Sequence, residues 1–158
     1  SKMQQSIDCW TIAITLQPEM LRAYNNRAVA YGRVGRQAEA VADYEKTLQL
    51  NSGFVRAWDD LAWLLATSDK KEIRDPERAI TLAAKACELS EFKDWTCLNT
   101  LATCSSETQD FDSAVKWAKA ARAIAPEAEH RELDKIVSAY EAEVQSKRIA
   151  TKPRSAIR

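Results

Sequence analysis

The feature that most restricts the fold of this chain is a similarity between segments that lie 34 residues apart. The matched pairs are Leu16/Leu50, Arg22/Arg56, Ala23/Ala57, Tyr24/Trp58 and Ala28/Ala62. A repeat of this length holds two short helices, which bury their apolar faces only by packing against neighbouring repeats. The sequence therefore predicts a row of similar helical pairs stacked side by side.

The composition favours helices throughout. Alanine, leucine, glutamate and lysine are abundant, whereas the 158 residues include only 3 Gly and 4 Pro. The abundant side chains lose little conformational freedom in a helix, while glycine and proline interrupt one, so we expect an all-α fold without strands. The expected helices cover residues 4–16, 21–34, 37–50, 54–67, 76–89, 93–106, 110–123 and 127–147.

Two short helices per 34 residues are typical of the tetratricopeptide repeat, and three segments resemble that family. The residues that carry the resemblance are Tyr24, Ala28, Tyr31, Gly35, Ala40, Tyr44 and Leu48; then Trp58, Leu61, Ala62, Leu65, Ala79, Ala83 and Ala86; and then Leu98, Leu101, Ala102, Phe111, Ala114, Ala121 and Pro126. The resemblance implies a right-handed α-solenoid of antiparallel helix pairs. It also implies that the first helices line a concave groove, and that the groove binds a partner protein or peptide.

Each of the three units has one alanine in its first helix and one in its second, where the two helices should cross. The pairs are Ala28 and Ala40, Ala62 and Ala79, and Ala102 and Ala114. Small side chains let two helices approach closely, and a larger one at such a contact would cost about 1–3 kcal/mol through overpacking. A general preference of alanine for helices does not account for its presence at both positions in all three units.

The middle unit differs from the others in length. The separation from Trp58 to Ala79 is five residues longer than that from Tyr24 to Ala40, and the extra length falls in the polar segment SDKKEIRDPER. This segment ends in Asp75-Pro76, a strong helix start. A middle repeat with such an insertion resembles repeats of large bacterial multi-domain proteins, so we expect the chain to be part of a longer polypeptide.

We therefore divide the chain into a helical solenoid, 1–147, and a basic flexible tail, 148–158. The solenoid comprises a half repeat at 4–18, full repeats at 21–53, 55–90 and 95–126, and a C-terminal capping helix at 127–147. Because the half repeat lacks its first helix, one face of the 4–16 helix is left uncovered. Docking of this helix on another copy of the chain, which would give a homo-oligomer, is therefore an alternative function.

Helical geometry places a second stripe of side chains on each first helix, turned away from the stripe that packs inside. We expect this second stripe to face the groove. The candidate partner-binding residues are Arg22, Asn25, Asn26, Val29, Arg33, Arg56, Asp59, Asp60, Trp63, Asn99 and Thr103.

Several of these residues also have a structural interpretation. Asn25 and Asn26 can donate and accept hydrogen bonds to a peptide backbone, or can be a solvated helix surface. Asp59 and Asp60 are expected in the first turn of their helix, where the macrodipole favours negative charge. Trp63 is either a binding anchor or a core residue under the inserted segment, and its apolar surroundings in LAWLLA favour packing.

Some tetratricopeptide proteins hold the carboxylate end of a peptide with Lys, Arg and Asn side chains spread over three first helices. This chain departs from that pattern, because its middle first helix offers Asp59 and Asp60 and its third offers Thr96, Asn99 and Thr100. The sequence therefore does not predict a clamp for acidic tails.

The sequence contains no recognisable catalytic, metal or cofactor motif. His130 is the single histidine, the three glycines form no phosphate-binding loop, and the four cysteines form no CxxC pair. We therefore expect neither an enzyme nor a cofactor-binding protein.

The charge and the hydropathy pattern bear on partners and location. The formal net charge is zero, which disfavours nucleic acid as a partner. No apolar run approaches 18 residues, so membrane insertion is not expected. The scattered cysteines fit a reducing compartment, and we expect a cytoplasmic location.

Overall fold

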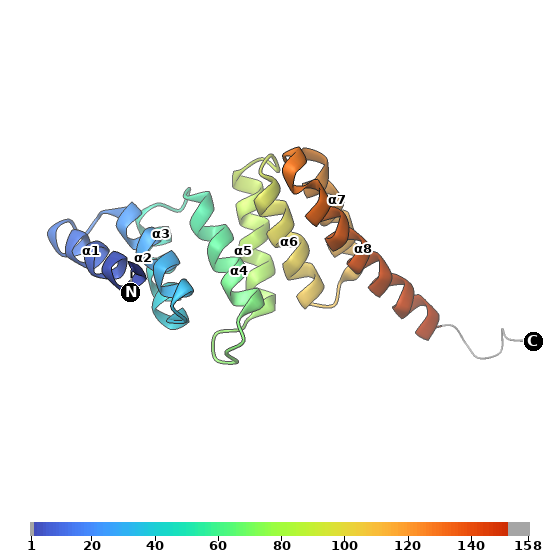
Figure 1. Cartoon of the computed structure of the whole chain (residues 1–158), viewed down its shortest axis with the longest axis horizontal. Helices are drawn as coiled ribbons and strands as arrows, with labels where there is room; N and C mark the ends of the chain where they lie inside the picture. The colour runs from blue at the N-terminus through green and yellow to red at the C-terminus, as the bar shows by residue number, and fades with distance from the viewer. Residues whose placement is uncertain (1, 152–158) are drawn as a thin grey trace, which may run out of the picture.

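The computed structural model describes residues 2–151, and these residues form helices joined by short linkers, with no strand among them. The helices are α1 (Lys2–Leu16), α2 (Leu21–Arg33), α3 (Gln37–Leu50), α4 (Val55–Thr67), α5 (Pro76–Leu89), α6 (Trp95–Glu107), α7 (Phe111–Ile124) and α8 (Glu127–Ala150). They follow one another along an elongated body, with α1 toward one end and α8 toward the other (Figure 1). The all-α helical repeat predicted from the sequence is confirmed.

The helices are arranged as pairs, α2 with α3, α4 with α5 and α6 with α7, and α8 packs on α7. The first helices of neighbouring pairs also meet, because α4 packs against α6 and α2 touches α4. This arrangement brings the outward stripes of α2, α4 and α6 onto one side of the molecule.

The six alanines at the predicted helix crossings have no exposed surface at all. Ala28, Ala62 and Ala102 lie on the first helices, and their partners lie on the second helices. Around them the core is filled by larger side chains such as Leu61, Leu98 and Leu101. The prediction that these alanines mark close contacts between helices is confirmed.

Helices α5, α6 and α7 begin at aspartate caps. The Asp75 side chain accepts a hydrogen bond of 3.0 Å from the backbone N–H of Arg78, as the Asp75-Pro76 pair predicted. Asp94 and Asp110 cap α6 and α7 in the same way. A carboxylate at this position satisfies a backbone donor that the helix itself leaves unpaired.

The linker between α4 and α5, residues 68–75, binds to both neighbouring units. Lys70 Nζ donates to the backbone oxygen of Gly35 at 2.7 Å, which connects the linker to the end of α2. Arg74 Nη1 donates to the backbone oxygen of Ala66 at 2.7 Å, and the same guanidinium pairs with Glu107 at the end of α6. The longer linker thus joins the ends of three units.

Both ends of the solenoid differ from its middle. On α1 the side chains of Ile12 and Leu16 are 61% and 76% exposed, as expected for a helix that lacks a partner on one face. The last helix continues to Ala150, so residues 148–150, predicted to begin the basic tail, are helical. Thr151 forms a turn after the helix, and residues 152–158 of the predicted tail lie outside the described residues.

Candidate functional site

The outward stripes of the three first helices form a surface that we call the α2/α4/α6 face. The structure brings all the sequence-predicted site residues to these helices, but at different depths. The exposed ones are Arg22, Asn26, Arg33, Arg56 and Trp63; the half-buried ones are Val29, Asp59, Asp60, Asn99 and Thr103. Asn25 differs from the rest, because it is only 4% exposed.

Trp63 is 46% exposed, so the interpretation as a core residue under the inserted segment was wrong. The interior side of α4 is occupied by Leu61, Ala62, Leu65 and Ala66, which are all at most 2% exposed. A helix cannot turn Trp63 toward the same side as these four residues. The indole is therefore left at the surface of the α2/α4/α6 face.

A cavity of about 380 Å³ lies between the N-terminal parts of α4 and α6, and its lining residue Asp59 stands one helical turn before Trp63. Its wall on α4 is made by four residues that lie close together in the chain, and its wall on α6 by three. The lining residues are Val55, Arg56, Asp59, Asp60, Asp94, Thr96 and Cys97. Sequence reasoning missed Val55, Asp94 and Cys97. The helix start in KDWT marked the position of Asp94 without indicating a cavity.

Asp59 and Asp60 stand in the second turn of α4, because the helix begins at Val55. The expected stabilisation by the first-turn macrodipole was therefore wrong, since that effect fades beyond the first turn. Burial raises the pKa of Asp59 to about 6, against a hydrogen bond with Thr100 that lowers it. Burial also raises the pKa of Asp60, and the nearby Arg56 guanidinium opposes this shift.

Four side-chain oxygens on this face are buried and accept no hydrogen bond. They are Asn25 Oδ1, Asp59 Oδ1, Asp60 Oδ2 and Asn99 Oδ1. Asn25, Asp59 and Asn99 are equivalent positions, each three residues before the buried alanine of its own first helix. Buried polar atoms normally have a partner, so a repeated row of unpaired acceptors needs a specific explanation.

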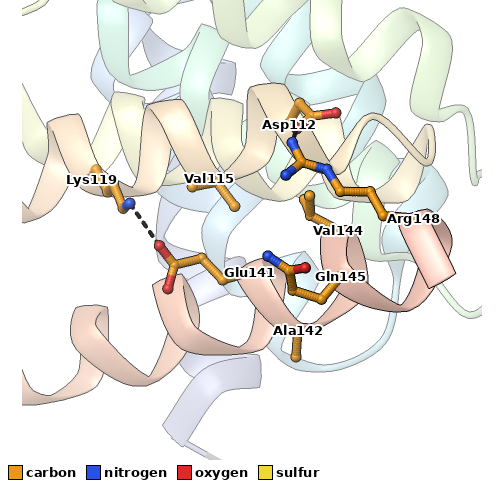
Figure 2. A pocket seen from close by; sticks show the side chains of 8 residues that line it. All are labelled: Asp112, Val115, Lys119, Glu141, Ala142, Val144, Gln145 and Arg148. Carbon is orange, nitrogen blue, oxygen red and sulfur yellow. Dashed lines mark ion pairs between the residues drawn. The ribbon is translucent and has the colours of Figure 1, made fainter.

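A larger groove of about 560 Å³ lies between α7 and α8, and its charges are paired within the chain (Figure 2). Lys119 Nζ lies 2.6 Å from Glu141 Oε1, and the two residues reach toward each other across the groove. Arg148 pairs with Asp112 at 3.6 Å at the other end. This groove therefore offers less uncompensated charge than the cavity between α4 and α6, in spite of its size.

The buried cysteines are poor candidates for chemistry. Burial raises the pKa of the Cys87, Cys97 and Cys104 thiols to about 12, with a further contribution from the negative charge of Asp59. A thiol with such a pKa remains protonated at neutral pH, and the thiolate is the reactive form. These residues thus behave as small apolar side chains on α5 and α6.

Comparisons with known proteins agree with this architecture. Residues 21–54, which span α2 and α3, match the family model of the tetratricopeptide repeat. A search of curated proteins found no match. Within residues 2–151, no helix is long and apolar enough to cross a membrane.

Similar solved structures include three of MamA. MamA 41-end from Desulfovibrio magneticus RS-1 is 10% identical with a TM-score of 0.70, over 92% of this chain and 88% of that one. The MamA RS-1 ArsTM double mutant is 13% identical with a TM-score of 0.69, over 96% and 88%. A crystal structure of MamA protein is 13% identical with a TM-score of 0.65, also over 96% and 88%.

At identities this low the likeness shows a shared fold and no shared partner. Repeats of the matched family serve as protein-interaction scaffolds, and the matched unit here is followed by further helix pairs of the same design. Residues 21–54 thus match one tetratricopeptide repeat, and the whole chain is similar in fold to solved helical-repeat structures.

Proposed function

We propose that the α2/α4/α6 face is the binding groove of an interaction scaffold, and that it holds an extended or helical segment of a partner protein. The observation that carries this proposal is the exposure of Trp63, which is 46% exposed and lies one helical turn after Asp59, a residue that lines the cavity. Aromatic side chains at the centre of an interface supply a large part of its binding energy.

The surroundings of Trp63 support a peptide as the occupant. Val29 and Thr103 hold the equivalent positions on α2 and α6, so the stripe that contains Trp63 continues with an apolar and a polar side chain. Asn26 is exposed and can both donate to and accept from a peptide backbone. The face is built from packed helices, so little conformational freedom is lost on the receptor side when a peptide binds.

The proposal contains no catalytic step and no cofactor. It assigns the chain a role as one module of a longer protein, and it assigns proteins as partners in place of nucleic acid. The solenoid at 1–147 is the interacting unit in this proposal.

A peptide array tests the proposal, because it samples many peptide sequences at once and requires no identified partner. We expect the labelled chain to bind a subset of random peptides, and we expect Trp63→Ala to lose that subset. The matched control is Ile124→Ala, because Ile124 is 48% exposed but lies on α7. Equal binding by all three proteins, or loss with Ile124→Ala alone, would contradict the proposal.

Self-assembly is the second candidate function, and the exposed apolar side chains of α1 favour it. Ile12 and Leu16 on α1 are 61% and 76% exposed, and Met20, just before α2, is 37% exposed. If α1 docks on another copy, sedimentation should show a mass that rises with concentration, and Ile12→Ser with Leu16→Ser should abolish the rise. A strict monomer at all concentrations would remove this candidate.

A further inference from the structure

We propose that the cavity between α4 and α6 receives a lysine or arginine side chain of the bound peptide, held by Asp59 and Asp60. This inference rests on the proposed function and adds the chemistry of the partner. It reverses the charge selection of a carboxylate clamp, because the groove would recognise a cation.

The cavity has more negative charge than its own residues neutralise. Of its three carboxylates, Asp94 is occupied, since its Oδ1 accepts hydrogen bonds from Thr96 N at 2.9 Å and Thr96 Oγ1 at 2.7 Å. The remaining two share one cation, Arg56. Its Nε lies 3.6 Å from Asp60 Oδ2, beyond hydrogen-bond distance, and its side chain is 75% exposed.

The row of unpaired acceptors points in the same direction. Asp59 Oδ1 and Asp60 Oδ2, on two of the residues that line the cavity, are buried without a hydrogen-bond partner. These oxygens need hydrogen-bond donors, and the charged groups of lysine and arginine side chains supply donors only. A bound carboxylate would instead add acceptors to a site that already has too many.

The depth of the two carboxylates strengthens their attraction for a cation. Their burial reduces solvent screening, so a charge placed in the cavity interacts with them more strongly than at an open surface. An organic cation fits better than a metal ion, because no three His, Cys, Asp or Glu side chains among residues 2–151 are placed to hold one.

Trp63 lies four residues after Asp59 and therefore on the same side of α4. A side chain whose charged end reaches Asp59 can place its aliphatic stem, or the next residue of the peptide, against the indole. The cavity and the aromatic anchor thus form two adjoining parts of one binding surface.

The test is a titration of the full 158-residue chain with acetyl-arginine methylamide. Binding is monitored by NMR through the backbone amide chemical shifts. We expect shifts that concentrate at residues 55–60 and 94–97. The neutral isostere acetyl-citrulline methylamide and acetyl-glutamate methylamide should leave these amides unmoved. Equal responses to the arginine and citrulline probes, or arginine-dependent shifts elsewhere only, would overturn the inference.

Variants and a second measurement complete the test. Asp59→Asn with Asp60→Asn should weaken binding of the arginine probe about tenfold or more, because two charge-assisted contacts are lost. Asp112→Asn, whose carboxylate is exposed on α7, should bind as the wild type does. In the wild type, saturating arginine probe should lower the apparent pKa of Asp59, read from its carboxyl carbon shift; an unchanged pKa would overturn the inference without any variant.

Binding should also depend on pH. The groups that face the Asp59 carboxylate are Arg56 and Asp60 on α4, Asp94 and Thr100 from α6, and the thiols of Cys87, Cys97 and Cys104. None of the thiols ionises near neutral pH, so the carboxylates control the response. The arginine probe should bind more weakly at about pH 5 than at about pH 7.5, because the Asp59 carboxylate is protonated at the lower value; the opposite trend would contradict the inference.

The two proposals fail in different ways. If peptide binding depends on Trp63 but the chain does not prefer arginine over citrulline, the inference about charge is wrong. The proposed binding groove then still stands. An arginine response that depends on Asp59 and Asp60, without any Trp63-dependent peptide, would remove the proposed function.

Discussion

The first helical pair holds a buried ion pair at positions where the two following pairs have apolar side chains. Between α2 and α3, Arg27 Nε lies 2.7 Å from Asp43 Oδ2 and Arg27 Nη2 donates to Asp43 Oδ1 at 2.8 Å. The two side chains are 15% and 8% exposed. The equivalent positions, one before the first-helix alanine and three after the second-helix alanine, carry apolar residues in the other pairs. These residues are Leu61 and Leu82 in α4/α5, and Leu101 and Trp117 in α6/α7.

The difference shows that one repeat architecture accepts either a buried ion pair or an apolar contact at its centre. Arg27 Nη1 also donates to Thr11 Oγ1 of α1 at 3.1 Å, so the ion pair continues to the incomplete end of the solenoid. A buried ion pair gains little over an apolar pair of similar size, because both charges must leave water. Removal of one of the two charged side chains nevertheless destabilises the fold, because the other charge stays buried without a partner.

Asp43→Ala should have the largest effect on stability. It leaves the Arg27 guanidinium buried without its partner, which costs about 3–5 kcal/mol in comparable sites. Urea denaturation followed by circular dichroism measures the change. The double variant Arg27→Leu with Asp43→Leu, which copies the middle pair, should recover most of the loss. A double variant as unstable as the single one would show that the two designs are not interchangeable.

Asp59→Asn should have an intermediate effect, and it converts the middle repeat to the residue that both neighbouring repeats carry. Because the folded-state pKa of Asp59 is about 6 and its unfolded value is near 3.8, its ionisation opposes folding. Protonation of Asp59 therefore favours the folded state. This stabilisation of the wild type is fully present below about pH 4 and is lost as the pH rises through about 6.

The variant should accordingly match the wild type near pH 4 and exceed it by about 1–3 kcal/mol at about pH 7.5. Urea denaturation at both values, with Asp112→Asn as the exposed control, measures the difference. A variant that is less stable than the wild type at the higher pH would mean that Asp59 is already compensated in the free protein.

Gln109→Gly should have the smallest effect and compares the turn after α6 with the turn after α2. Gly35 and Gln109 are equivalent, seven residues after the first-helix alanine, and both adopt positive φ, 77° and 65°. A side chain in this left-handed region costs about 1 kcal/mol, which glycine avoids. We expect a gain of up to about 1 kcal/mol in thermal or urea unfolding; Gln109→Ala, which keeps the strain, should not show it. A loss of stability in the glycine variant would assign another role to the Gln109 side chain.

The sequence predicted the helices and their contacts well because both depend on local and repeated patterns. Every expected helix is present with ends within a few residues, and the alanines at the crossings are all buried. The depth of single side chains on the α2/α4/α6 face was harder to predict. Asn25 is 4% exposed although the helical stripe predicted an outward side chain, and Trp63 is 46% exposed although its apolar neighbours favoured a core position.

The cavity between α4 and α6 could not be predicted from the sequence alone. A helical stripe indicates which side chains point outward, but a cavity depends on how neighbouring pairs are rotated against each other. Asp94 illustrates this, since its capping role follows from its position before α6, whereas its place opposite Asp59 and Asp60 requires the packed structure.

The most direct test of the binding face is photo-crosslinking with benzoylphenylalanine placed at position 63 or, in a second protein, at position 124. Each protein is irradiated with a peptide selected on the array. The account predicts a crosslink from position 63 on α4 and none from position 124 on α7. A crosslink from position 124 alone would contradict it, because the partner would then lie away from the α2/α4/α6 face.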